Sequence, residues 1–358
     1  MTIPERKDDH IRFSLEHDVQ CTVPAGFDDV TFIHTSLPEL SYDELDTSAT
    51  LFGKRLSLPF MISALTGGSP TAERINARLA RLAQDAGIAV SVGSQRAMLE
   101  DGSLRPTFEM RAYAPDALLF ANIGIAQLIH LGNDAVHGLV DAIGADVLAV
   151  HLNPLQEVVQ PEGDTDFRGG IARLRDLSDD ASYPVIVKET GAGISAEVAE
   201  KVSFLDGVDV SGVGGTSFAA VEYHRAAEPS ARASARTFWD WGIPTVPSII
   251  EVAEHFETII ASGGVRNGLH VAKALALGAR CAGLALPFLE AVQNQGPGGA
   301  EALLAQLSRE LRMAMLLTGS RDLEALSRRS VIISGSTRTF ITDRGFSTEY
   351  YARKEEFT

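Results

Sequence analysis

The sequence predicts an α/β protein folded as a (β/α)8 TIM barrel with an N-terminal cap segment. Eight short apolar runs, many of them β-branched, recur along the chain, and amphipathic stretches separate them. This alternation is typical of parallel strands connected by helices. The competing fold, a doubly wound open sheet, normally has a GxGxxG turn after its first strand, and the turn here reads ALTGGSP.

The eight predicted strands follow in order at residues 59–65, 88–93, 118–123, 147–150, 184–188, 207–212, 257–264 and 280–286. Apolar residues at helical spacing predict helices at 71–87 and 267–279. Residues 1–58 precede the first strand and contain a helix-like segment at 5–17 and a hairpin pattern at 49–59. We expect residues 1–58 to form a cap or lid on one barrel end, and residues 59–358 to form the barrel with a C-terminal helical extension.

The composition is that of an acidic, water-soluble protein. With 31 basic and 47 acidic residues the net charge is −16, which disfavours binding to nucleic acid or an anionic membrane. No apolar run approaches the roughly 18 residues of a membrane helix. Cys21 and Cys281 are the only cysteines, which favours the reducing cytoplasm. An anionic substrate would need a local basic cluster, and Arg6, Lys7 and His10 provide one unless they only form a solvated helix start.

Polar and Gly-rich residues gather where the predicted strands end. The functional face of such a barrel lies at the C-terminal ends of its strands, so these residues are candidates for a site. Gly-rich stretches at 212–217, 262–266 and 283–285 lie at or near the ends of the last three predicted strands. Glycine lets backbone N–H groups approach a phosphate closely, and Arg266 adds a forked donor. The three turns together predict a phosphate site.

Lys188 ends the apolar run PVIVK, and the residue alone leaves three interpretations open. It could be a structural lysine at a strand end or a Schiff-base lysine of a class I aldolase. It could also be a cation beside a flavin ring, where it stabilises negative charge on the reduced cofactor. In that third interpretation, Asn122 and Thr66 are hydrogen-bond partners for the polar edge of the ring.

Nine motifs occur in order along the chain, and the match to which they belong runs from residue 6 to about residue 290. They are RKDDH (6–10), FDDV (27–30), LTGG (65–68), GSQR (93–96), HLNPLQE (151–157), PEGD (161–164), VIVKETGAGIS (185–195), DVSGVGGTSF (209–218) and ASGGVR (261–266). Together they resemble type 2 isopentenyl diphosphate isomerase. The resemblance implies an FMN-binding barrel that needs Mg²⁺ and interconverts isopentenyl and dimethylallyl diphosphate in isoprenoid biosynthesis. It also implies reduced FMN as acid/base cofactor, NADPH as reductant, and a homo-oligomer, either a tetramer or an octamer.

The same resemblance assigns roles at matching positions. FMN would contact Ser63, Ala64, Leu65, Thr66, Ser94, Asn122, Lys188, Ser211, Thr216, Gly263, Gly264, Arg266, Ala285 and Leu286. Substrate would contact Arg6, Lys7, His10, Ser94, Gln95, Arg96, Asn153 and Gln156. Mg²⁺ would bind Glu157, and the catalytic residues would be Gln156, His151 and Lys188. The sequence departs from many relatives in having Leu65 instead of methionine, and from some in having Thr190 instead of serine.

The stretch HLNPLQE places several polar side chains directly after a predicted strand, where they are costly unless they face a ligand or cap a loop. His151 and Asn153 are two apart, so in a strand they point to one side. Glu157 is a hard oxygen ligand of the kind that Mg²⁺ accepts beside substrate phosphates. Gln156 cannot titrate, so it can orient a double bond but cannot be the main acid or base. We expect a clamp whose positive charge comes from Arg6, Lys7, Arg96, His151 and the metal.

Other functions fit the sequence less well. An FMN-dependent oxidoreductase of the 2-hydroxy acid oxidase type would need a catalytic histidine near the 212–217 turn, and none lies between residues 209 and 223. A class I aldolase would keep Lys188 but would not need three Gly-rich turns. A non-catalytic flavin- or anion-binding module would leave Gln156, Glu157 and the Arg6–Lys7 pair without a role.

Overall fold

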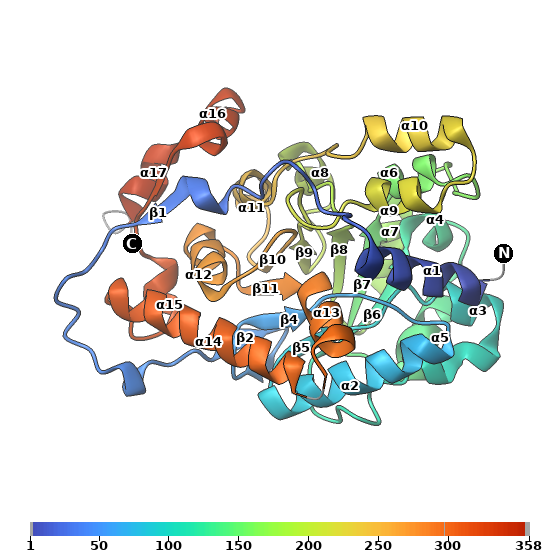
Figure 1. The fold of residues 1–358 in the computed structure, drawn as a ribbon, viewed down its shortest axis with the longest axis horizontal. Helices are drawn as coiled ribbons and strands as arrows, with labels where there is room; N and C mark the ends of the chain where they lie inside the picture. The colour runs from blue at the N-terminus through green and yellow to red at the C-terminus, as the bar shows by residue number, and fades with distance from the viewer. Residues whose placement is uncertain (1–2, 297, 355–358) are drawn as a thin grey trace.

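Eight parallel strands form a closed barrel in the computed structural model, which describes residues 3–296 and 298–354 (Figure 1). Neighbouring strands pair in parallel, and β11 closes the ring on β4. The strands are β4 (Phe60–Ile62), β5 (Ala89–Ser91), β6 (Leu119–Gly124), β7 (Val147–Leu152), β8 (Val185–Glu189), β9 (Gly207–Asp209), β10 (Ile259–Ser262) and β11 (Cys281–Leu284). They overlap the eight predicted runs, and the predicted (β/α)8 barrel is confirmed.

Helices surround the barrel and connect its strands (Figure 1). They are α2 (Pro70–Ala86), α3 (Arg96–Glu100), α4 (Ile125–Leu128), α5 (Asn133–Ile143), α6 (Pro154–Val159), α7 (Gly170–Asp180), α8 (Ala196–Lys201), α9 (Phe218–Arg225), α10 (Pro229–Thr237), α11 (Thr245–Val252), α12 (Gly268–Leu277) and α13 (Leu286–Asn294). Short 3-10 turns are η1 (Phe27–Asp29), η2 (Tyr42–Glu44) and η3 (Gly102–Phe108).

Both helices predicted from apolar spacing are present as α2 and α12. Helix α2 begins where the Ser69 side chain accepts a hydrogen bond from the backbone N–H of Ala72, with a proline in the first turn. Helix α12 begins in the same way at Asn267, whose side chain accepts from the backbone N–H of His270 at 2.7 Å. These caps satisfy backbone donors that a helix start otherwise leaves unpaired.

The N-terminal segment contacts the barrel at two opposite ends. Helix α1 (Ile3–Glu16) packs against α9 beside the C-terminal ends of the strands. The hairpin β2 (Ala49–Leu51) and β3 (Lys54–Leu56) places Leu51 and Leu56 against Met61 and Ala89 in the interior at the other end. The predicted helix and hairpin are therefore present, but only the helix lies near the functional face. The domain boundary after residue 58 stays a prediction.

The C-terminal extension is mostly helical, and it packs back on the barrel. It contains α14 (Gly299–Leu317), α15 (Leu323–Ser327), α16 (Gly335–Asp343) and α17 (Thr348–Ala352). Strand β12 (Val331–Ile333) pairs antiparallel with β1 (Val30–Phe32), so the extension also holds the N-terminal segment (Figure 1). Within the described part of the chain, no helix is long and apolar enough to cross a membrane.

The barrel interior changes from apolar to polar toward the C-terminal ends of the strands. Its apolar layer consists of Met61, Ala89, Phe120, Ala149, Ile186, Ile260 and Cys281. Side chains alternate along a strand, so residues two positions later also face inward. These residues are Ser63, Ser91, Asn122, His151, Lys188, Ser262 and Gly283, and Asp209 takes the corresponding place on β9. The barrel therefore presents a ring of mostly polar residues to whatever binds above it.

Candidate active site

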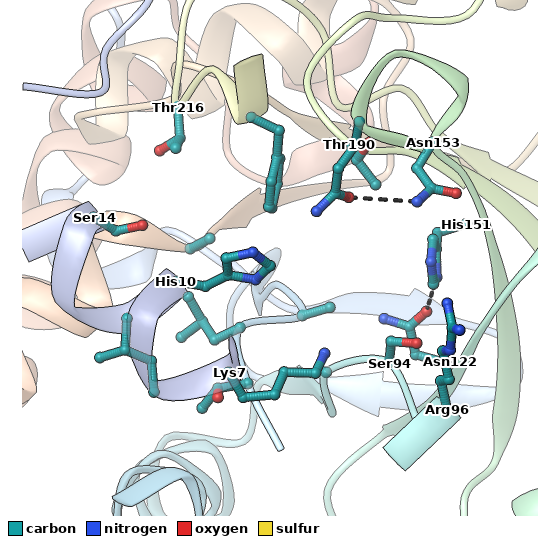
Figure 2. Close-up of a pocket in the computed structure, with 18 of the residues that line it drawn as sticks. Lys7, His10, Ser14, Ser94, Arg96, Asn122, His151, Asn153, Thr190 and Thr216 are labelled. Carbon is teal, nitrogen blue, oxygen red and sulfur yellow. Dashed lines mark hydrogen bonds between the residues drawn. The ribbon is translucent and has the colours of Figure 1, made fainter. Parts of the chain in front are cut away.

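A cavity opens above this polar ring, between the strand ends and helix α1. Figure 2 shows Lys7 and His10 reaching from α1 toward Asn122 and His151 on the opposite wall. Predicted site residues that line the cavity are Lys7, His10, Ala64, Leu65, Thr66, Ser94, Arg96, Asn122, His151, Asn153, Gln156, Glu157, Lys188, Thr216, Ala285 and Leu286. The cap helix and seven of the strand ends therefore meet around one space.

A second cavity adjoins the first and shares Ala64, Lys188, Thr216 and Leu286 with it. The remaining residues predicted to bind flavin lie here, namely Ser63, Ser211, Gly263, Gly264 and Arg266. The two cavities together are therefore lined by every residue that the sequence assigns to FMN.

Gly-rich turns form the floor of the second cavity and bring backbone atoms very close together. Gly263 has a φ of 97°, and a Cβ there would lie 2.1 Å from the carbonyl oxygen of Gly212. Only glycine fits both the backbone conformation and the space. Arg266 follows directly and also lines this cavity, and its guanidinium donates to the side chain of Gln20. The turn, the arginine and the start of α12 form the arrangement that binds phosphates in such barrels.

Two hydroxyl groups in these cavities have no hydrogen-bond partner among the described residues. They are Ser63 Oγ and Thr66 Oγ1, and both are buried. Asn153 Oδ1 is in the same situation beside Glu157. An unsatisfied buried polar atom costs free energy, so a ligand with polar edges is the simplest partner for each.

The imidazole of His151 is buried and neutral. Its Nδ1 lies 2.8 Å from Asn122 Oδ1, while Asn122 Nδ2 donates to the backbone oxygen of Val92 at 3.2 Å. The Asn122 oxygen is therefore the acceptor, so Nδ1 of His151 carries the proton and Nε2 has a free lone pair. Burial, with Lys188 and Lys7 nearby, lowers the pKa of His151 to about 3. This contradicts the expectation that His151 adds positive charge for a diphosphate.

Glu157 is held in a fixed orientation at the edge of the cavity. Its carboxylate accepts hydrogen bonds from Asn153 Nδ2 at 2.8 Å, from Gln160 Nε2 at 2.7 Å and from the Asp164 backbone N–H at 2.7 Å. Asn153 Nδ2 also lies 3.4 Å from Gln156 Oε1 (Figure 2). Gln160 was not predicted, although it lies one helical turn after Gln156 and so faces the same side. Among the described residues, no group of three or more His, Cys, Asp or Glu side chains could hold a metal.

Two residues predicted to bind substrate, Gln95 and Arg6, are not among the described residues that line the cavity. Gln95 is fully buried and does not line it, because its side chain donates to the Leu139 backbone oxygen and accepts from the Asn122 backbone N–H. Gln95 therefore fixes the strand that carries Asn122. Arg6 lies in α1, but its side chain is outside the described part of the structure.

Helix α1 is fixed to the cavity by a histidine–carboxylate contact that sequence analysis missed. His10 Nε2 lies 3.2 Å from Glu222 Oε1, and Arg225 donates to the other oxygen of Glu222 at 2.8 Å. Burial lowers the pKa of His10, against the opposite effect of Glu222. Phe218, one turn before Glu222, forms part of the cavity wall. The sequence did offer an indication of this contact. Phe218 and Glu222 are four residues apart directly after the 212–217 turn, so in a helix they lie on one face.

Comparison with curated proteins identifies the family. The isopentenyl-diphosphate delta-isomerase of Halobacterium salinarum is 46% identical over 349 residues, which is 95% of this chain and 96% of the relative. That of Methanosarcina mazei is 43% identical over 355 residues, 97% of both chains, and that of Thermococcus kodakarensis is 43% identical over 350 residues, 95% of this chain and 94% of the relative. The chain belongs to the isopentenyl-diphosphate delta-isomerase family. The resemblance seen in its motifs is thereby confirmed, and the chain is an enzyme.

A family model described as FMN-dependent dehydrogenase also matches this isomerase, over residues 149–333. Among solved structures, a mandelate oxidase has a TM-score of 0.63 and 20% identity, covering 92% of this chain and 95% of that chain. A lactate oxidase from Pediococcus acidilactici has a TM-score of 0.62 and 16% identity, covering 91% of this chain and 87% of that chain. At such low identity these oxidases show the shared fold alone.

We expect Gly124→Ala to reduce isomerase activity by on the order of 10²-fold, because it displaces His151. A Cβ on Gly124 would lie 2.8 Å from His151 Nε2 and 2.4 Å from Gln127 Oε1. Overpacking of this kind costs about 1–3 kcal/mol of stability, so the variant should still fold. The control is Gly138→Ala on α5, where a Cβ meets nothing within 4 Å. Unchanged steady-state kinetics for Gly124→Ala would contradict the placement of His151 in the site.

Proposed function

We propose that this isomerase interconverts isopentenyl diphosphate and dimethylallyl diphosphate with reduced FMN and Mg²⁺. The observation that carries the proposal is the joining of two sites in one continuous space. Gly-rich turns with Arg266 offer a cradle for a phosphate, and Glu157, Lys7 and Arg96 line the adjoining cavity. The flavin phosphate would meet the backbone N–H groups of the turns and Arg266. The substrate diphosphate would meet Lys7 and Arg96 in the other cavity.

FMN fits the residues present. Its phosphate would bind at Gly263, Gly264 and Arg266, and the polar edge of its ring would meet Ser63 Oγ and Thr66 Oγ1, which lack partners. Lys188 lies where both cavities meet, so its ammonium can stabilise negative charge on the ring. When bound in its reduced form, FMN would supply the acid/base chemistry at the substrate double bond.

Glu157 lines the larger cavity, and its carboxylate can serve as a ligand for Mg²⁺. A carboxylate has about four acceptor positions, and three are occupied by Asn153, Gln160 and Asp164, which leaves one for a cation. Mg²⁺ commonly takes one or two carboxylates and completes its shell with substrate phosphate oxygens and water. Glu157 would therefore bind the metal mainly together with the diphosphate.

The remaining side chains can bind and orient the substrate. Lys7 and Arg96 face the cavity and can contact the diphosphate, while neutral His151 can accept a hydrogen bond through Nε2. Gln156 cannot titrate, and its amide beside Asn153 can orient the substrate. Ile11, Phe218 and Leu289 give the cavity an apolar wall for the prenyl group. NADPH as reductant, a homo-oligomeric state and a cytoplasmic location belong to the same proposal.

The absorption spectrum of the purified protein and an isomerase assay test this function. We expect a flavin spectrum and conversion of isopentenyl diphosphate that requires both Mg²⁺ and a reductant. Turnover without flavin, or without a divalent cation, would contradict the corresponding part of the proposal. Oxidation of a 2-hydroxy acid by the oxidised protein, without any isomerase activity, would favour the oxidase function instead.

We expect Lys7→Met to raise the KM for isopentenyl diphosphate by about tenfold or more and to leave FMN affinity unchanged. A charge-assisted hydrogen bond contributes roughly 1.5–3 kcal/mol, and Lys7 lines the substrate cavity but not the phosphate cradle. Substrate should also protect α1 from limited proteolysis, because the helix closes one side of the cavity. Equal cleavage near residues 5–20 with and without substrate, and an unchanged KM, would remove α1 from substrate binding.

A further inference from the structure

The polar ring of the barrel contains a buried carboxyl group on the strand next to Lys188. Asp209 on β9 is 1% exposed and is the register partner of Lys188 on β8. Ser262 Oγ donates to Asp209 Oδ1 at 2.5 Å. Asp209 Oδ2 has no hydrogen-bond partner among the described residues. A buried carboxylate with one unsatisfied oxygen is costly, so something must compensate its charge.

Lys188 is the cation available to Asp209. Burial raises the pKa of Asp209, and Lys188, the Ser262 hydroxyl and the backbone N–H of Ser211 oppose that rise. From β11 the buried Cys281 thiol faces the carboxylate, which together with burial raises the pKa of this cysteine. The groups that face Asp209 from the packed strands thus include only one positive charge within the described chain.

Asp209 is also the carboxylate available to Lys188. Lys188 also acts on Glu189, but burial raises the pKa of Glu189 to about 7, and its Oε2 already accepts hydrogen bonds from the backbone N–H groups of Thr190 and Ala192, each at 2.5 Å. Lys188 Nζ donates to the backbone oxygen of Glu189 at 2.6 Å, which fixes the ammonium at the strand end. On its other side Lys188 is the register partner of His151, which is neutral. The row His151–Lys188–Asp209 therefore places a neutral imidazole, a lysine side chain and a buried carboxyl group on three neighbouring strands.

We propose that Asp209 is a positioning residue whose carboxylate is the counter-charge of Lys188 and sets the electrostatic potential at the cofactor face of the cavity. The inference rests on the proposed binding of FMN beside Lys188. When Asp209 is ionised, the net charge of Lys188 and Asp209 together is close to zero, and the flavin ring would experience little positive potential from them. Without it, an uncompensated ammonium would favour the more negative, reduced form of the flavin.

The first experiment measures the flavin of the holoenzyme after Asp209→Asn, which keeps the shape and removes the charge. We expect a more positive midpoint potential and an affinity of the oxidised flavin for sulfite that rises by on the order of tenfold. Ser262→Ala keeps the charge and should change both values much less. Asp176→Asn removes an exposed carboxylate far from the cavity, and it should change neither. An unchanged potential and unchanged sulfite affinity in Asp209→Asn would overturn the proposal.

The second experiment needs no flavin and follows thermal unfolding against pH. In Lys188→Met the folded-state pKa of Asp209 should rise further above its unfolded value. A raised carboxyl pKa contributes stability below the unfolded pKa, and that stability is lost as pH rises through the folded pKa. Lys188→Met should therefore lose stability from about pH 4 toward neutral, and the added change Asp209→Asn should abolish this loss.

The two experiments separate this inference from the proposed function. A wild-type protein that binds no FMN would contradict the function, while the unfolding cycle would still test the pairing of Lys188 with Asp209. If FMN binds and the double variant shows the same pH-dependent loss as Lys188→Met, the pairing is wrong. If Asp209→Asn does not fold, the comparison of Lys188→Met with the wild type gives the answer, because an equal dependence of stability on pH in the two proteins would mean that Lys188 does not compensate Asp209.

Discussion

Lys188→Met is expected to reduce isomerase activity by on the order of 10²–10³-fold and to weaken FMN binding. The Lys188 side chain lies where the two cavities proposed to hold flavin and substrate meet, and its Nζ donates to the backbone oxygen of Glu189. Its loss removes the cation that stabilises negative charge on the reduced ring. It also leaves the buried Asp209 without a counter-charge. Flavin content after gel filtration and turnover with added FMN measure the two effects separately.

A matched control for this variant exists elsewhere in the chain. Lys354 is buried like Lys188, and its Nζ donates to the backbone oxygen of Ala276 at 2.8 Å, outside both cavities. Lys354→Met should therefore affect stability but neither flavin content nor turnover. Normal flavin and near-normal turnover in Lys188→Met would make Lys188 a structural lysine. Reductive trapping of a carbonyl substrate on Lys188 with borohydride would favour the aldolase function instead.

Glu157→Gln is expected to raise the Mg²⁺ concentration needed for half-maximal activity by on the order of 10–100-fold. The substitution keeps the shape of the side chain but removes the charge that attracts the cation. The new amide would also face two donors, the Gln160 side chain and the Asp164 backbone N–H. An amide rotation of Gln160 can restore one of these contacts. The flavin residues lie elsewhere on the barrel, so the flavin spectrum should not change.

The controls for Glu157→Gln distinguish the metal from the fold. Glu109→Gln removes an exposed carboxylate that pairs with Arg105, and it should leave the Mg²⁺ requirement unchanged. Gln160→Ala keeps the ligand but removes one of its hydrogen bonds, so a smaller increase is expected. Loss of flavin together with metal dependence in Glu157→Gln would mean that Glu157 supports the fold or the cofactor. It would then not be the metal ligand.

The sequence by itself determined the barrel and most of the residues around its cavities. Period-two and helical patterns are local properties of the chain, and a (β/α)8 barrel places every strand end on the same face. Residues as distant as Thr66, Lys188 and Arg266 could therefore be assigned to one site before any contact was known. The Gly-rich turns were also readable, because glycine is required by local backbone geometry.

Only the tertiary structure decided how charge is distributed around these residues. His151 was expected to be a cation, but its burial beside Lys188 and its contact with Asn122 make it a neutral acceptor. Gln95 belongs to a site motif and yet lies behind the wall, because both ends of its amide bond the backbone of other strands and helices.

The same holds for the two carboxylates that sequence analysis left without a role. Glu222 contacts His10 on a helix 212 residues away, and Asp209 is the register partner of Lys188 on the neighbouring strand. The position of an Asp or Glu in the sequence does not predict whether its carboxylate will contact solvent, a histidine or a lysine. Its protonation and its function depend on burial and on partners that come from other strands, and the closure of the barrel alone brings these together.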